Sequence, residues 1–261
     1  MGLDVTRLYN AGSVYFNPGF NHPKNSVRFG NSLPSDSFES SSPRRFTSET
    51  ALKKAIDNNP KIKVILAEMN APATLNMKEL NELLNGHAAD VQNIASGIIE
   101  NLPFSLKNKV NIKAVNDAAY LHDLGKALIP PAVLNKNGKL NDFETKIMHR
   151  HSELSYELLK NSGIDKTTLN LIRNHHQNAK RSGYPFVDNS FNADLNLQIL
   201  SMADKYSALR EKRVYKDPLT KKQALTIIYK DVKDGKLHPF VFKALVDYSN
   251  ITEVSDTELF V

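Results

Sequence analysis

The chain of 261 residues contains no cysteine. Without thiols there can be no disulfide framework, no zinc–thiolate site and no iron–sulfur cluster. Any metal in this protein must therefore be held by histidines and carboxylates, a donor set that suits iron, manganese, magnesium or zinc in a catalytic rather than a structural site. The absence of cysteine also fits a reducing compartment.

The sequence also lacks long apolar runs and a secretory signal. No stretch of about 18 consecutive apolar residues occurs, which argues against a membrane span, and the N-terminus has no positively charged start followed by an apolar core. We therefore expect a soluble cytoplasmic protein with no membrane partner. The net charge of +6 suits an anionic ligand, but the basic residues are scattered, so we expect no DNA partner.

Composition divides the chain into three segments. Residues 1–47 are rich in Asn, Ser, Pro and Gly, so this N-terminal segment is predicted to be poorly ordered because it buries too little apolar area. Residues 48–250 have helical patterning and, in a chain that is 41% hydrophobic, enough apolar residues for one large core. Residues 251–261 are interpreted as a C-terminal tail.

Apolar residues recur at three- and four-residue steps through most of the central segment, which predicts an all-α fold. The longest such stretch, residues 77–101, places His87 on its apolar stripe. Another helix is expected over residues 115–124, followed by an extended connection at Ile129-Pro130-Pro131. Residues 61–69 are ambiguous between strand and helix. Further helices are expected over residues 48–59, 143–151, 156–160, 167–176, 195–210, 220–234 and 239–248.

The most informative motif is the pair His122-Asp123, with Lys126 three residues behind the aspartate. One neutral nitrogen and one anionic oxygen are good donors for a divalent metal, but a pair alone cannot make a catalytic site. Five further candidate donors occur at wide spacing: His87, His151, His175, His176 and Asp204. Burying so many polar rings and carboxylates costs free energy unless each is paired, and a shared metal satisfies all of them together.

Each donor also has a plainer interpretation. A lone histidine on an apolar stripe, such as His87, usually donates a hydrogen bond to a backbone carbonyl in the core, and Asp204 could cap a helix or form a salt bridge. His149 competes with His151, because residues two apart cannot share a helix face and spacing alone does not choose between them. Lys126 alone is typical of a solvated lysine, but beside a metal it is well placed to hold a phosphate oxygen.

Together these residues resemble the HD superfamily of metal-dependent phosphohydrolases and, within it, the HD-GYP family. The resemblance covers about residues 78–248. It depends on His122-Asp123-Leu124-Gly125-Lys126, on the helical segment headed by His151, on His175-His176 with Gly183-Tyr184-Pro185, and on Asp204 with Arg213 and Tyr215. By this resemblance the ligand is His151 rather than His149.

The resemblance implies an all-helical HD-type bundle with a metal centre in its core and the activity of a cyclic di-GMP phosphodiesterase. It implies two divalent ions, iron or manganese by preference and magnesium or zinc as other options. The metal ligands would be His87, His122, Asp123, His151, His175, His176 and Asp204. Asp123 would bridge the ions, and a metal-bridged hydroxide would cleave the substrate to pGpG or GMP. Asp123 and Lys126 would be the catalytic residues, and the substrate would contact Lys126, Tyr184, Arg213 and Lys216.

Five positions depart from the family pattern. Leu83 occupies the position of a glutamate that binds a third metal, so two ions are predicted. Gln177 replaces a glutamate, Lys180-Arg181 replace Asp-Gly and add two positive charges near the cleft entrance, and Ser207 replaces a second aspartate in the last ligand helix. These changes leave the predicted metal ligands intact.

Two alternative functions stay open on the sequence. One is an HD phosphohydrolase that acts on another nucleotide or phosphoester, which the change at Lys180-Arg181 favours. The other is a non-catalytic metal-binding module for signalling or interaction. The intact donor set argues against the second alternative, because a scaffold has no need of buried ligands. A homodimer or a signalling partner is compatible with any of these functions.

Overall fold

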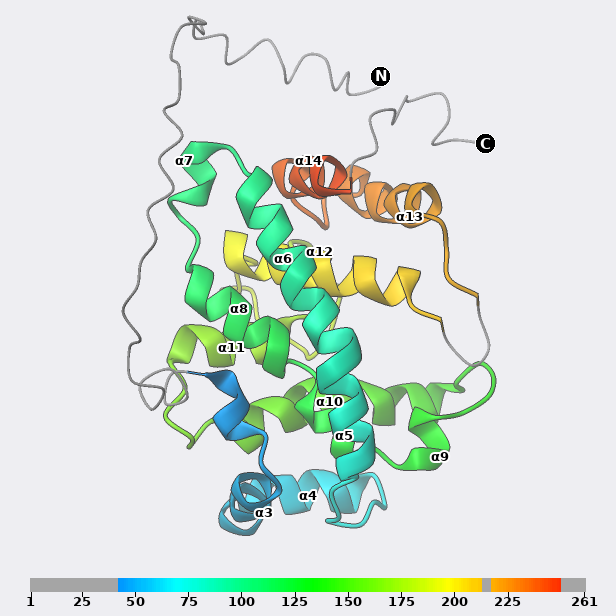
Figure 1. The fold of residues 1–261 in the computed structure, drawn as a ribbon. Coiled ribbons are helices and arrows are strands. Elements are labelled where there is room, and N and C mark those ends of the chain that lie inside the picture. Colours follow the sequence, from blue (N-terminus) through cyan, green and yellow to red (C-terminus); the bar gives the residue numbers. More distant parts are fainter. Residues whose placement is uncertain (1–41, 213–216, 250–261) are drawn as a thin grey trace, which may run out of the picture. The chain divides into compact units, whose positions relative to one another are not determined.

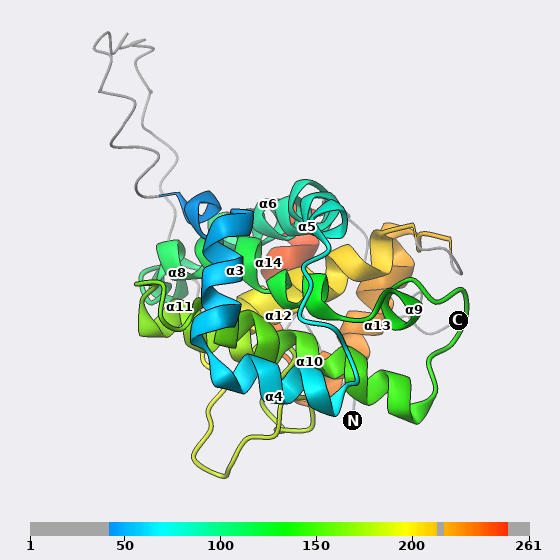
Figure 2. The ribbon, with the colours of Figure 1, turned by 90° about the horizontal axis from the view of Figure 1, so that it is seen from below.

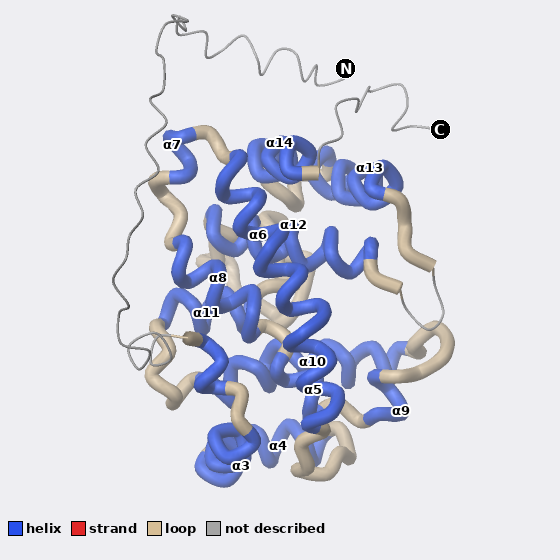
Figure 3. Tube along the Cα trace, in the orientation of Figure 1, coloured by secondary structure: helices blue, strands red, loops and turns tan. Residues whose placement is uncertain are grey.

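Helical periodicity in the sequence is realised as helices throughout the computed structural model, which describes residues 42–212 and 217–249. Figure 3 shows helices joined by loops, with no strand in these two ranges. No helix in them is long and apolar enough to cross a membrane. The helices (Figure 1) are α3 Glu49–Asn58, α4 Pro60–Glu68, α5 Met77–Leu83, α6 Ala89–Asn101, α7 Phe104–Lys107, α8 Ile112–Leu121, α9 Pro131–Leu134, α10 Asp142–Leu159, α11 Lys166–Asn174, α12 Leu195–Arg210, α13 Lys221–Lys233 and α14 Pro239–Tyr248.

Polar side chains define where several of these helices begin. At α10, the Asn141 side chain accepts from the Glu144 amide while the Glu144 carboxylate accepts from the Asn141 amide. Thr220 and Gln223 form the same reciprocal pair at α13, and Asp194 caps α12. Such caps satisfy amide groups that have no partner within the helix. The helices that carry the site therefore begin at positions determined by local sequence.

Helix α6 lies at the centre of the core, where it packs against α8, α12 and α14 (Figure 1). Its apolar stripe of Val91, Ile94 and Ile98 is fully buried. Gly97 allows α14 to approach closely, because a Cβ at this position would lie 2.1 Å from the ring of Tyr248. On another face of the bundle, α3 and α4 pack across α10 (Figure 2). Of the two long ligand-bearing helices, α10 is thus covered by α3 and α4, and α12 packs against α6.

The predicted start of the ordered region, at residue 48, is slightly late. Residues Pro43–Phe46 form a 3₁₀ turn in which the Ser42 side chain accepts from the Arg44 amide, and Phe46 packs against the core. A proline at the first helical position has its φ already set for a helix, which explains why this turn forms. The predictions for residues 1–41 and 251–261 lie outside the described residues.

Four helix predictions change in detail. Of the ambiguous residues 61–69, all but the last are helical, since Asn59 caps α4 and Pro60 begins it. The separate helix predicted over residues 156–160 is wrong, because no glycine or proline interrupts α10 and these residues form its end. Helix α8 ends at Leu121 rather than at residue 124, and a 3₁₀ turn, Leu124–Leu128, follows the His-Asp pair. Residues 77–101 are helical as predicted, but Leu84–Ala88 form a π-helical turn around His87.

Candidate metal centre

Five segments that are far apart in sequence bring the seven predicted donors together: the π-helical turn, the end of α8, α10, the end of α11, and α12. All seven are buried except His176, which is partly exposed. Three overlapping groups have donor atoms within 4.8 Å of one another: His151, His175 and His176; His87, His122 and Asp204; and His122, Asp123 and His175. Asp204 lies in the middle of α12 and caps no helix.

Asp123 lies between two pairs of imidazoles. Its Oδ2 atom is 3.3 Å from Nε2 of His122 and 3.6 Å from Nε2 of His87. Its Oδ1 atom is 3.3 Å from Nε2 of His151 and 3.9 Å from Nε2 of His175. A carboxylate whose two oxygens face different pairs of nitrogen donors has the geometry of a ligand shared between two ions.

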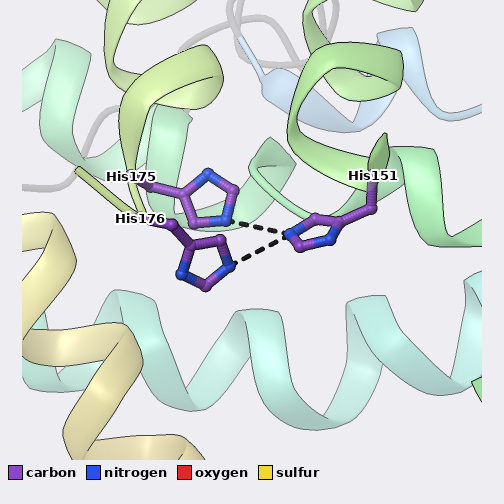
Figure 4. A group of neighbouring side chains, drawn as sticks. All are labelled: His151, His175 and His176. Carbon is purple, nitrogen blue, oxygen red and sulfur yellow. Dashed lines mark hydrogen bonds between the residues drawn. The ribbon is translucent and has the colours of Figure 1, made fainter. Parts of the chain in front are cut away.

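Three of the histidines are oriented by their own backbone. In His122, His151 and His175, Nδ1 lies 2.8, 2.6 and 2.7 Å from the carbonyl oxygen three residues earlier. Because a carbonyl only accepts, each Nδ1 carries the proton and each Nε2 presents a lone pair to the centre. Nε2 of His151 lies 3.3 Å from Nε2 of His175 and 3.1 Å from Nε2 of His176, and the three rings converge (Figure 4). The Nε2 lone pairs of His151 and His175 repel at this distance unless a positive charge is shared between them.

Buried polar atoms and shifted pKa values indicate that a cation would bind at the centre of this cluster. Within the described part of the chain, Nε2 of His122 and Oδ1 of Asp123 are buried without a hydrogen bond, a costly state for polar atoms. Burial lowers the pKa of His122, but Asp123 and Asp204 reverse this and leave the pKa raised, so positive charge is favoured here. Burial lowers the pKa of His151 to about 4 and that of His175 to about 3. Both rings are therefore neutral near pH 7 and fit a divalent metal.

The side chain of Lys126 reaches the same centre, as its position one turn after the aspartate predicts. Its Nζ atom lies 2.5 Å from Oδ2 of Asp123, and the lysine side chain is 19% exposed. Burial alone would raise the pKa of Asp123, but Lys126 and His122 hold it well below its usual range. An ammonium group next to the shared carboxylate is well placed to meet a phosphate oxygen.

A loop beside the centre carries Tyr184. The Tyr184 ring lies 4.5 Å from the ring of His176 and stacks on His149 at 3.6 Å with an interplanar angle of 12°. His149 is thus a support for the tyrosine rather than one of the converging donors. Gln177 is buried, and its Nε2 donates to the carbonyl of Pro185 at 2.5 Å. The glutamine that departs from the family pattern therefore holds this loop.

Some predicted contributors are placed elsewhere or not described. Arg213 and Lys216, predicted to contact substrate, lie outside the described residues. Lys180 and Arg181 are exposed, and the Arg181 guanidinium donates to the carbonyl of Asn189. Their charges are at the surface of the loop that precedes Tyr184.

Two features of the centre have no counterpart in the sequence predictions. Gly125 approaches α10 so closely that a Cβ there would lie 2.2 Å from the carbonyl oxygen of His151. A glycine beside a His-Asp pair is a usable signal of such an approach. Ser207 lies between His87 and Asp90. No sequence signal indicates this contact, because it joins residues 117 or more positions apart.

Comparison with known proteins gives a family and a set of relatives. The HD domain family matches residues 72–240, more than half of the chain. A cyclic di-GMP phosphodiesterase response regulator of Xanthomonas campestris is 35% identical over 142 residues, which are 53% of this chain and 36% of that protein. The 3′3′-cGAMP-specific phosphodiesterase 2 of Vibrio cholerae is 36% identical over 111 residues, which are 42% of this chain and 21% of that protein. The chain thus spans only about a third or less of these relatives.

The fold agrees with this assignment. A solved protein of Bdellovibrio bacteriovorus, described as an HDG"Y"P protein, superposes with a TM-score of 0.51 at 16% identity, covering 81% of this chain and 66% of that one. At this identity the structural similarity shows only that the helical fold is shared. The family match over residues 72–240 is what assigns the chain to a family. The chain belongs to the HD domain family.

Proposed function

We propose that this protein is a metal-dependent phosphodiesterase that hydrolyses cyclic di-GMP, with two divalent ions, iron or manganese, as its cofactors. The observation that supports this most directly is the set of imidazole Nε2 atoms facing one another around a single buried carboxylate, Asp123. Relatives named as phosphodiesterases of cyclic dinucleotides support the substrate class.

The donor geometry suggests how two ions would be shared. Asp123 would contact both ions, since its two oxygens face different imidazole pairs. When bound, ions of this kind lower the pKa of water toward neutrality and neutralise charge on a phosphoryl group. One ion would be held by His87, His122 and Asp204, and the other by His151, His175 and His176.

The protein's own groups would bind and orient the substrate. Lys126 places its ammonium 2.5 Å from Asp123, where it can hold a phosphate oxygen and stabilise charge that develops on it. Burial raises the pKa of Tyr184, so its ring is a neutral phenol beside His176 that can contact a base or a phosphate. Hydrolysis of one P–O3′ bond of cyclic di-GMP gives linear pGpG, and hydrolysis of the second gives GMP.

A related cyclic dinucleotide is a second candidate substrate. Three relatives from Vibrio cholerae are named 3′3′-cGAMP-specific phosphodiesterases, at 36%, 31% and 28% identity. This molecule differs from cyclic di-GMP in one base only, so the same metal centre and Lys126 would act on its phosphates. The groups that contact the bases would determine which of the two dinucleotides is hydrolysed faster.

Metal analysis of the anaerobically purified chain, combined with turnover assays, tests the proposed function. We expect about two ions per chain, faster hydrolysis of cyclic di-GMP than of 3′3′-cGAMP, and loss of both activities on chelation with recovery on adding Mn²⁺. Faster hydrolysis of 3′3′-cGAMP would favour the second substrate. Protein without bound metal, or metal-loaded protein that cleaves neither dinucleotide, would contradict the proposal.

Replacing Lys126 by methionine is expected to lower kcat for cyclic di-GMP about a hundredfold, the size of effect typical of losing one group that stabilises transition-state charge. The metal content should not fall, because an ammonium is not a ligand. The matched control is Lys113→Met, which removes an exposed lysine paired with Asp117 on α8, and it should leave kcat unchanged. Equal rates for the Lys126 variant and the wild type would argue against a role in substrate binding.

A further inference from the structure

His87 is oriented differently from His122, His151 and His175. In His122, His151 and His175, Nδ1 faces a carbonyl oxygen of the same helix. His87 lies in a π-helical turn, and its Nδ1 atom is instead 3.1 Å from Oγ of Ser207 on α12. A side chain from another helix therefore orients the ring of His87, as the local backbone orients the rings of these three histidines.

The proton positions in this contact follow from a third residue. Oγ of Ser207 lies 2.6 Å from Oδ2 of Asp90 on α6. A carboxylate only accepts, so Ser207 must donate its single hydroxyl proton to Asp90. The serine oxygen is then left to accept, and the only proton His87 can offer it is on Nδ1. Nδ1 of His87 is therefore protonated, and Nε2, on the side of the ring where Oδ1 of Asp204 lies at 3.0 Å, is the nitrogen left to bind a metal.

We infer that Asp90 and Ser207 are positioning residues that fix the tautomer of His87 and so make its Nε2 a metal ligand, an inference that rests on the proposed metal centre. Hydrogen bonds of this kind from ligand histidines to carboxylates orient the ring and raise its basicity. Here the carboxylate acts through one hydroxyl rather than directly.

Other charged groups near His87 do not replace this chain of hydrogen bonds. Oε2 of Glu211 is 3.8 Å from Nδ1, beyond hydrogen-bond distance. Asp204 and Asp123 face the opposite nitrogen, Nε2, at 3.0 and 3.6 Å. Ser207 is 2% exposed, so water does not easily take the place of its hydroxyl.

Ser207 is also one of the departures from the family pattern noted in the sequence. A serine replaces an aspartate at this point of the last ligand helix and cannot supply a negative charge. Asp90, three residues after His87, supplies the carboxylate from a different helix. The negative charge next to Nδ1 of His87 thus comes from α6 and acts through Ser207 of α12.

Calorimetric titration of the metal-free chain with Mn²⁺ tests this inference without any substrate. Ser207→Ala is expected to weaken one of the two sites about 10- to 100-fold, the usual cost of losing an outer partner of a ligand histidine, and to leave the other site unchanged. Asp90→Asn should act in the same direction but less strongly, since an amide oxygen still accepts from Ser207. The matched control is Ser249→Ala, which removes a hydroxyl of equal burial, 3% exposed and bonded to the carbonyl of Val246, and should change neither site.

The tautomer itself gives a second readout, from ¹⁵N spectra of histidine side chains in metal-free protein, with His87 assigned by a His87→Gln variant. The wild type should show His87 protonated on Nδ1, and Ser207→Ala should shift protonation toward Nε2. A double variant, Asp90→Asn with Ser207→Asp, moves the carboxylate onto His87 directly and should restore both the tautomer and Mn²⁺ affinity. This restoration would not occur if Ser207 served only to fill space.

The outcomes separate this inference from the proposed function. Wild-type protein that binds two Mn²⁺ ions but cleaves no cyclic dinucleotide would overturn the function and leave the inference standing. Ser207→Ala protein that keeps both Mn²⁺ affinities and the Nδ1 tautomer would overturn the inference, whatever the activity. A double variant that folds but does not regain the tautomer would overturn it too.

Discussion

Replacing Asp123 by asparagine is expected to remove metal from the protein and to lower phosphodiesterase activity by about a thousandfold or more, beyond the effect of losing a single charge-stabilising donor. Asparagine keeps the size of the side chain but has only one oxygen. It cannot face both His122 and His151 with an oxygen, as Asp123 does at 3.3 Å on each side. It also leaves the ammonium of Lys126 without a counter-charge.

The experiment measures bound metal by elemental analysis and hydrolysis of cyclic di-GMP on the same preparation. Asp117→Asn is the matched control, because it also removes a lysine-paired aspartate contributed by the α8 segment, in this case outside the centre. That variant should keep two ions and wild-type turnover. If the Asp123 variant kept both ions and full turnover, the proposal that two ions share this carboxylate would be contradicted.

Replacing Gly125 by alanine is expected to destabilise the fold by about 1–3 kcal/mol, the usual cost of forcing extra atoms into a packed site. A Cβ at this position would lie 2.2 Å from the carbonyl oxygen of His151 and 2.7 Å from the amide of Ser155, and backbone cannot move aside as a flexible side chain can. For a domain of this size the melting temperature should fall by about 2–4 °C for each kcal/mol. Metal affinity should fall as well, because the added methyl separates Asp123 from His151.

Thermal unfolding followed by circular dichroism, with and without Mn²⁺, measures this effect. Gly86→Ala is the control, since no heavy atom lies within 4 Å of a Cβ at that helical position. Alanine there should stabilise the protein slightly, by up to about 1 kcal/mol, through its helix propensity. A Gly125 variant as stable as the wild type, with the same Mn²⁺ affinity, would show that α10 and the turn after His122 do not depend on their close approach.

Much of the fold can be predicted because helix formation depends on local sequence. The stripe of apolar residues in α6, the reciprocal cap at Asn141 and the aspartate cap at Asp194 are all readable within a few positions. Errors occur where a local signal is weak or misread. Residues 156–160 show a short pattern that looks complete in itself, and Pro43 begins a turn inside a segment whose composition suggests disorder.

The candidate ligands can also be proposed from residue types and spacing, but the choice between neighbours cannot. His149 and His151 are equivalent as donors in the sequence, and the choice of His151 came from the family resemblance. In the structure His149 stacks on Tyr184, whereas His151 faces Asp123 and His175. Which side of α10 faces the centre depends on how that helix packs.

The sequence by itself determined the helical class, the absence of thiolate sites and the seven candidate donors, because each depends on residue type or on a period of a few residues. Only the tertiary structure decided that Asp123 turns its two oxygens to different imidazole pairs, that Gly125 lets α10 come close, and that Asp90 reaches His87 through Ser207. These are contacts between residues up to 120 positions apart. Local periodicity contains no information on such distances, which are determined by how the helices pack.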